Sequence, residues 1–226
     1  MASGKTKTSW ESAGSWLGKD RAIGPMIAAA AAADENATQL SGEVVDAIDE
    51  AGLFAIMVPR ELGGGEAHPD EVIDAISEIS YWDGSAGWYA HAVMTGGAVA
   101  GAHLGPRAVA AIFPNGRFLQ VAGQAAPSGR AERVGDCYRI SGRFSFGSGS
   151  PSAQWLVGGY RLHLGDEAVT SENGQPVMLI GLAPRSHATL LGNWDVLGLR
   201  GTGSYDFEIH EQLLHEDFFL DSAAPV

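Results

Sequence analysis

The 226-residue sequence has a single cysteine, few positive charges and no long apolar run. Because Cys137 has no second thiol in the chain, an intramolecular disulfide is excluded, and with it a disulfide-stapled secreted scaffold. Lys and Arg number 14 against 27 Asp and Glu, which gives a formal net charge of −13. Phosphate binding depends on clustered Lys and Arg, so we expect no nucleic acid partner.

The apolar segments are too short to cross a membrane. The Ala-rich stretch 26–33 is followed at once by Asp34 and Glu35, whereas a transmembrane helix needs about 20 apolar residues. A signal-peptide pattern is also absent from the start of the sequence. We therefore expect a cytoplasmic protein without a membrane partner. The histidines have no metal-ligand spacing, and we expect no metal site.

Helical periods dominate the first half of the sequence. Residues 1–14 are rich in Ser, Thr, Lys and Gly and are expected to form a flexible N-terminus. A helical domain is expected over 15–115, with Pro25 as a break or first turn and Ser85 as a helix cap. The expected helices cover 16–40, 42–50, 69–83, 86–104 and 107–113.

The character of the chain changes at Pro114. Short apolar runs now alternate with Gly, Pro, Asn and Asp, a pattern typical of a small antiparallel β-barrel or sandwich. We expect this β-domain to cover 116–220, so the fold class is α+β. The expected strands cover 118–122, 138–146, 155–160, 177–182 and 205–210.

The segment Tyr138–Trp155 carries the main chemical signal. It contains alternating strand residues and then a loop of Ser and Gly, flanked by aromatic side chains. The glycines allow a flat ligand to come close to the backbone, and Ser145 and Ser148 offer hydroxyls. A second glycine-containing block follows at Trp194–Ser204. Together the two blocks indicate a flavin pocket, and thus a redox enzyme.

These motifs, in this order, resemble the acyl-CoA dehydrogenase fold superfamily. Within it the chain is most similar to the reduced-flavin-dependent monooxygenases, the oxygenase components of two-component aromatic hydroxylases. The matching segments are Val58–Gly64, Gly84–Trp88, Gly142–Gly149 with Trp155, and Trp194–Ser204.

The resemblance also implies a third part of the fold, a C-terminal four-helix bundle that builds the oligomer. This sequence ends at Val226, about where the bundle would begin. Three interpretations stay open: the chain is a fragment, a partner subunit supplies the bundle, or catalysis has been lost. We expect a homo-oligomer or a complex with such a subunit.

The resemblance assigns a set of flavin-contacting residues. Ser148 would face flavin N5, and backbone N–H groups after the first strand would line the pyrimidine edge. Arg200 would contact the flavin or an anionic substrate group, or would instead pin its loop to a carboxylate. The predicted cofactor-binding residues are Gly123, Gln124, Ser145, Phe146, Ser148 and Arg200.

Trp88 and His91 are the predicted substrate-binding residues. They lie one helical turn apart and could line a cavity between the two domains. His91 is the only candidate for catalysis, as an acid or base near neutral pH. The alternative is a histidine that is merely packed or hydrogen-bonded.

Three functions follow from this interpretation. The first is a monooxygenase that uses oxygen and reduced FMN or FAD, delivered by a flavin reductase, on an aromatic or related small substrate. The second is an acyl-CoA dehydrogenase that transfers hydride to FAD. The third is a non-catalytic, truncated paralogue or subunit of such an enzyme.

Overall fold

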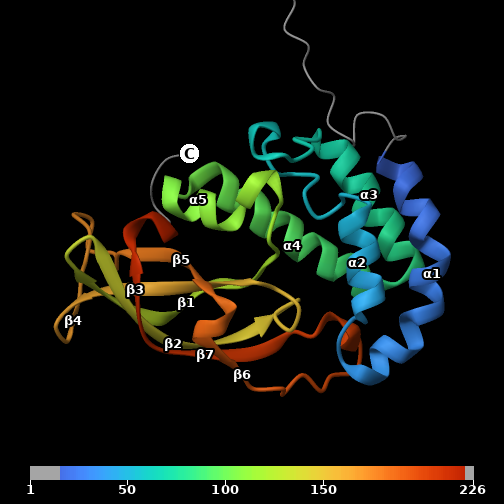
Figure 1. The fold of residues 1–226 in the computed structure, drawn as a ribbon. Helices are drawn as coiled ribbons and strands as arrows, with labels where there is room; N and C mark the ends of the chain where they lie inside the picture. The colour runs from blue at the N-terminus through green and yellow to red at the C-terminus, as the bar shows by residue number, and fades with distance from the viewer. Residues whose placement is uncertain (1–15, 222–226) are drawn as a thin grey trace, which may run out of the picture.

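Five α-helices precede eight β-strands in the computed structural model, which describes residues 16–221 (Figure 1). The expected flexible segment 1–14 lies outside the described residues. The helices are α1 (Trp16–Ala37), α2 (Gly42–Glu50), α3 (Pro69–Trp82), α4 (Gly84–His103) and α5 (Pro106–Ile112). The strands are β1 (Val121–Val134), β2 (Cys137–Gly147), β3 (Trp155–Leu164), β4 (Glu167–Ala168), β5 (Met178–Pro184), β6 (Ala188–Leu190), β7 (Tyr205–His215) and β8 (Phe219–Asp221).

Helix α1 runs through Pro25, where the sequence predicted a break or a first turn. Proline removes one backbone donor from a helix, but packing can outweigh that loss. The preceding Gly24 lies directly against the indole of Trp82 on α3, so closely that a Cβ at position 24 would meet the ring at 2.2 Å. The contact between α1 and α3 thus holds the helix together across the proline.

Helix α4 lies at the centre of the molecule, with α3 on one side and β1 on the other. Its N-cap is Asp83, whose carboxylate accepts a hydrogen bond from the backbone N–H of Ala86 at 2.7 Å. The prediction that Ser85 caps this helix was wrong, because the Ser85 hydroxyl donates to Glu35 instead. Gly96 allows α4 to approach β1, since a Cβ there would lie 2.8 Å from the carbonyl oxygen of Val121.

The strands form one mixed sheet in the order β6-β7-β2-β1-β3-β5-β8, with β4 paired to β3. The α+β class is confirmed, but the expectation of a purely antiparallel sheet was wrong for one pair, because β1 and β3 are parallel. The loop 148–154 carries the chain from β2 across the end of β1, and β3 therefore returns on the opposite side of β1 from β2. Within residues 16–221, no helix has the length and apolar character needed to span a membrane.

Strands β1 and β2 pair only over part of their length. Their antiparallel register runs from Val134↔Cys137 to Arg130↔Ser141. Beyond that point β2 stays paired with β7, and β1 stays paired with β3. The edge of residues 121–129 that faces β2 consequently has no strand partner among the strands of residues 16–221. This divergence opens the sheet directly beneath α4.

Candidate active site

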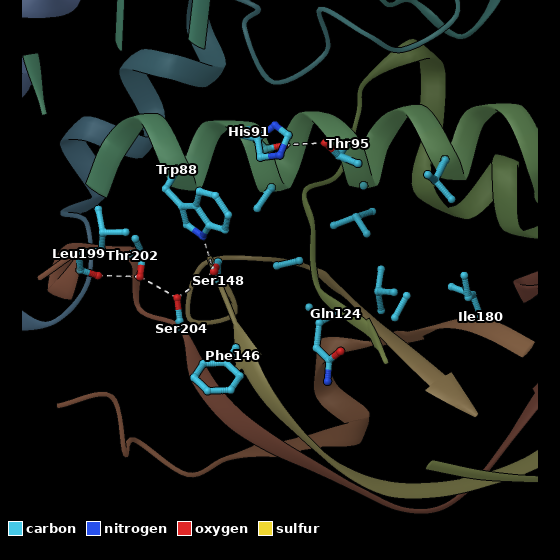
Figure 2. Close-up of a pocket in the computed structure, with 18 of the residues that line it drawn as sticks. Trp88, His91, Thr95, Gln124, Phe146, Ser148, Ile180, Leu199, Thr202 and Ser204 are labelled. Atoms are coloured by element: carbon cyan, nitrogen blue, oxygen red, sulfur yellow. Dashed lines mark hydrogen bonds between the residues drawn. The ribbon is translucent and has the colours of Figure 1, made fainter. Parts of the chain in front are cut away.

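A cavity of about 580 Å³ lies between α4, the diverging ends of β1 and β2, and the loop 194–204 (Figure 2). Volumes of this size are typical of small-molecule and cofactor sites. Its lining contains no Asp, Glu, Lys or Arg, and His91 is its only titratable side chain among the described residues. The lining residues are Trp88, His91, Ala92, Thr95, Gly96, Val99, Val121, Ala122, Gly123, Gln124, Ala125, Phe146, Ser148, Val157, Ile180, Trp194, Leu199, Thr202 and Ser204.

Most of the predicted site residues meet at this cavity. Those that line it are Gly123, Gln124, Phe146, Ser148, Trp88 and His91. Ser145 and Arg200 lie outside the lining. The Ser145 side chain instead hydrogen-bonds the carboxylate of Asp206 and helps to hold the pKa of that carboxyl below its usual range, although burial acts to raise it.

Phe146 enters the cavity because β2 contains a bulge. Phe144 pairs with Phe207 and Gly147 with Tyr205, so β2 has one residue more than β7 in this interval. A bulge redirects the side chains that follow it. Phe144 is buried in the sheet core, while Phe146 takes a φ of 62° and is 66% exposed. Such a φ is rare for a bulky residue, and strained residues of this kind cluster at functional sites.

The backbone of β1 forms the floor of the cavity on the opposite side. Gly123 has a φ of 125°, and the register with β3 shifts between Gln124 and Gly129. The Gln124 side chain does not point freely into the cavity, because its Oε1 accepts a hydrogen bond from the Ala126 N–H at 2.6 Å. The unpaired main-chain edge of β1 and the Gln124 amide are thus polar groups that this strand offers at the cavity.

Trp88 and His91, the predicted substrate-binding residues, stand on α4 at the rim of the cavity. Their ring centroids are 5.7 Å apart, and both side chains are exposed. A second cavity of about 390 Å³ lies between α3 and α4 and is also lined by Trp88, His91 and Leu199. These three side chains thus stand between two apolar spaces.

Four hydroxyl and indole groups form a hydrogen-bonded chain beside the cavity (Figure 2). The Trp88 indole N–H donates to Ser148 Oγ at 3.0 Å, and Ser148 Oγ lies 2.8 Å from Ser204 Oγ. Ser204 Oγ lies 2.6 Å from Thr202 Oγ1, which donates to the Leu199 carbonyl at 2.8 Å. The Ser148, Thr202 and Ser204 side chains are all buried.

Arg200 holds the loop that carries this chain. Its Nη1 lies 2.6 Å from a carboxylate oxygen of Asp195, and its Nε donates to the Glu35 carbonyl at 3.1 Å. Of the two predicted roles of Arg200, these contacts match the one in which the side chain pins its loop to a carboxylate. Because Arg200 fixes residues 199–204, it acts on the cavity through the backbone.

The Glu35 carboxylate joins three elements behind the cavity. It accepts hydrogen bonds from Ser85 Oγ at 2.5 Å and from the backbone N–H groups of Arg200 and Gly201 at 3.2 Å each. Burial acts to raise the pKa of the Glu35 carboxyl, but these hydrogen bonds and the Arg200 charge outweigh it and hold the pKa below its usual range. The stabilisation is thus present above the ordinary carboxyl pKa and is lost as the pH falls through the lowered value.

We expect Glu35→Ala to destabilise the loop more than the rest of the chain. The three lost hydrogen bonds to a charged acceptor predict a fall in unfolding free energy of about 2 kcal/mol. Hydrogen exchange should accelerate first at residues 199–204. Glu43→Ala, at an exposed glutamate on α2, is the matched control. Equal exchange rates in the loop of both variants would contradict this role.

No cluster of three or more His, Cys, Asp or Glu side chains within residues 16–221 is arranged to hold a metal ion. Sequence reasoning missed most of the apolar lining, including Ala92 and Val99 on α4. Thr202 and Ser204 lie in the predicted block Trp194–Ser204 but had no predicted role. The alternation of hydroxyl residues with Gly201 and Gly203 was the signal that could have marked them.

The chain is similar to known proteins over most of its length. Residues 22–108 match the family model described as acyl-CoA dehydrogenase, N-terminal domain. Indole-3-acetate monooxygenase of Pseudomonas putida is 34% identical over 181 residues, which make up 79% of this chain and 44% of that protein. The oxygenase subunit HsaA of a flavin-dependent monooxygenase from Rhodococcus jostii is 28% identical over 187 residues, or 81% of this chain and 46% of that protein.

The fold of the chain is also similar to that of solved structures. The crystal structure of the HsaA monooxygenase from M. tuberculosis matches with a TM-score of 0.84 and 26% identity. That match covers 92% of this chain and 52% of the solved chain. The chain therefore spans about half the length of the relatives that it matches.

Proposed function

We propose a flavin-dependent function for this chain, which belongs to the acyl-CoA dehydrogenase fold superfamily, as its motifs predicted. Its cavity binds the isoalloxazine ring of a flavin and contributes to a monooxygenase reaction on an aromatic or related small molecule. The observation that carries this proposal is the apolar cavity under α4, which brings six of the eight predicted site residues together.

The cavity suits a flat, largely apolar ring. Its volume of about 580 Å³ lies within the range of cofactor sites. The lining offers aromatic faces at Trp88, Phe146 and Trp194, together with a few polar groups that can fix the orientation of a ring. Because no described cation lines the cavity, the phosphate groups of FMN or FAD would lie outside it.

The residues of this chain have distinct roles in the proposal. Gly123 and Gln124 would present the open backbone edge of β1 to the polar edge of the ring, and Ser148 would meet N5. Phe146 would cover an apolar part of the ring, and Arg200 and Ser145 would support the loops. A bound reduced flavin supplies the electrons that activate oxygen. The chain orients the reactants and excludes water.

His91 would be the acid or base of the reaction, because it is the only titratable side chain among the described residues of the lining. The monooxygenase is favoured over the acyl-CoA dehydrogenase alternative, because relatives that match most of this chain are named as monooxygenases. We further propose a cytoplasmic location, a flavin reductase as partner, and either a homo-oligomer or a subunit that supplies a helical bundle.

The test is flavin binding by the purified chain under anaerobic conditions. FMN and FAD are titrated in parallel, each oxidised and dithionite-reduced, and binding is followed by fluorescence and calorimetry. We expect saturable binding of one flavin per chain, tighter for the reduced form. A chain that binds neither flavin in either state would overturn the proposal.

A further inference from the structure

The hydrogen-bonded chain beside the cavity has only one possible direction. A backbone carbonyl can only accept, so the single hydroxyl proton of Thr202 is committed to the Leu199 carbonyl. Ser204 must therefore donate to Thr202 Oγ1, and Ser148 must in turn donate to Ser204 Oγ. The Trp88 N–H, which can only donate, completes the series at Ser148. No hydroxyl in the series can be reversed alone.

This direction leaves Ser148 as an acceptor toward the cavity. Its hydroxyl proton is committed to Ser204, and its backbone N–H donates to the Phe146 carbonyl at 2.9 Å. One lone pair of Oγ receives the Trp88 N–H, and one lone pair remains. Ser148 lines the cavity, so a ligand atom that meets its hydroxyl must bring a proton of its own.

The start of the series is held in place from several sides. The Leu199 carbonyl also accepts the Trp194 indole N–H at 3.1 Å and the Thr202 backbone N–H at 3.2 Å. Leu199 has a φ of 57°, in the left-handed region that leucine rarely adopts. The contacts of Arg200 with Asp195 and Glu35 fix the turn that follows. The direction is thus set at the loop and not at Ser148.

The flavin ring changes its hydrogen-bonding character at N5 with its redox state. Oxidised N5 carries a lone pair and accepts, whereas two-electron-reduced N5 carries a proton and donates. An acceptor at Ser148 is complementary to the reduced state and leaves oxidised N5 without a partner, and sites built for one hydrogen-bonding partner reject the analogue that lacks it. We infer that Thr202 and Ser204 are positioning residues that fix the direction of the Ser148 hydroxyl and so select the reduced flavin. The inference rests on the proposed function, in which Ser148 meets N5.

Thr202→Val is the sharpest test, because it removes the hydroxyl at nearly constant shape. Without Thr202 Oγ1, the Ser204 proton has only Ser148 Oγ to turn to, and the Ser148 proton is released toward the cavity. We expect the ratio of affinities for reduced and oxidised FMN to fall at least about tenfold, which lowers the two-electron potential of bound flavin by about 30 mV. Ser204→Ala should act in the same direction.

Two controls separate direction from packing. Thr202→Ser keeps the hydroxyl and should keep the wild-type ratio. Ser150→Ala removes a buried hydroxyl from the same region, where Ser150 Oγ donates to the Gly203 carbonyl at 3.5 Å outside the series. It should leave the ratio unchanged. Unfolding temperatures of all four variants show whether each remains folded.

The outcomes distinguish this inference from the function on which it rests. A wild-type chain that binds neither form of FMN or FAD overturns the proposed function and the inference together. Flavin binding in which Thr202→Val and Ser204→Ala keep the wild-type ratio within twofold overturns the inference alone, and so does a wild-type chain without preference for the reduced form. A lowered ratio in both variants, with both controls unchanged, supports it.

Discussion

Ala92→Trp is expected to abolish flavin binding by this chain. Ala92 lies on α4 and lines the cavity, so an indole at this position would fill the space required by the ring. Moving α4 away from β1 to make room for the indole would break the close packing of Gly96 against the Val121 backbone and would cost free energy. We predict a loss of affinity of at least about 100-fold, or about 2.8 kcal/mol, in anaerobic titrations with reduced FMN.

The matched control is Ala102→Trp. Ala102 lies on the same helix but is exposed and does not line the cavity. The change in residue type is identical, so any general effect of tryptophan on helix α4 should be seen in both variants. Unaltered binding by Ala92→Trp, in a chain that remains folded, would show that the flavin does not occupy this cavity.

Asp20→Asn should make the chain more stable at pH 8 than the wild type. The Asp20 side chain on α1 is fully buried, and neither carboxylate oxygen has a hydrogen-bond partner among the described residues. Burial, and then the charge of Glu78 on α3, raise the pKa of Asp20 to about 7, although Lys19 acts to lower it. The Glu78 carboxylate is itself held by Arg21 and the Trp82 indole.

The sign of this effect follows from the two states of the chain. Between about pH 4 and pH 7 the folded chain keeps the Asp20 proton and the unfolded chain has lost it, so wild-type stability falls as the pH rises through that window. Three pKa units correspond to about 4 kcal/mol at most, and we expect Asn to recover about 2 kcal/mol because the buried amide is also unpaired.

Urea unfolding at pH 4 and pH 8 measures the difference between the two chains. We expect almost no gain at pH 4 and the full gain at pH 8. Asp74→Asn, at an exposed position on α3, controls for the loss of one carboxylate. A gain of the same size at both pH values would mean that the ionisation of Asp20 does not limit stability.

The sequence predicted the helices well because their apolar periods match their buried faces. Val44, Val45 and Ile48 recur at helical spacing, and all three are buried in α2. The sequence did not predict the parallel pairing of β1 and β3, since the order of strands depends on where a loop crosses the sheet. It also placed the end of the first strand too early, because the small and polar residues after Ala122 lack the alternation of a half-buried strand.

The sequence predicted the cavity residues that belong to a local chemical motif. It did not predict those that only the fold brings to the cavity. Phe146 and Ser148 belong to one short motif, and both line the cavity. Ser145 belongs to the same motif, but its side chain hydrogen-bonds the Asp206 carboxylate instead of lining the cavity, and the bulge in this part of β2 cannot be predicted from the sequence. Ala92 and Val99 have no chemical signature, and only the position of α4 above the diverging strands brings them to the cavity.

The fixed direction of the hydroxyl series has a consequence for proton conduction. Passing a proton along the series from Ser148 would require the Leu199 carbonyl, its terminal acceptor, to take up that proton. An amide oxygen is far too weakly basic to do so. The series can therefore hold hydrogen bonds, but it cannot transfer a proton from the cavity to the loop. Among the described side chains that line the cavity, only His91 is titratable, and its ring stands at the exposed rim.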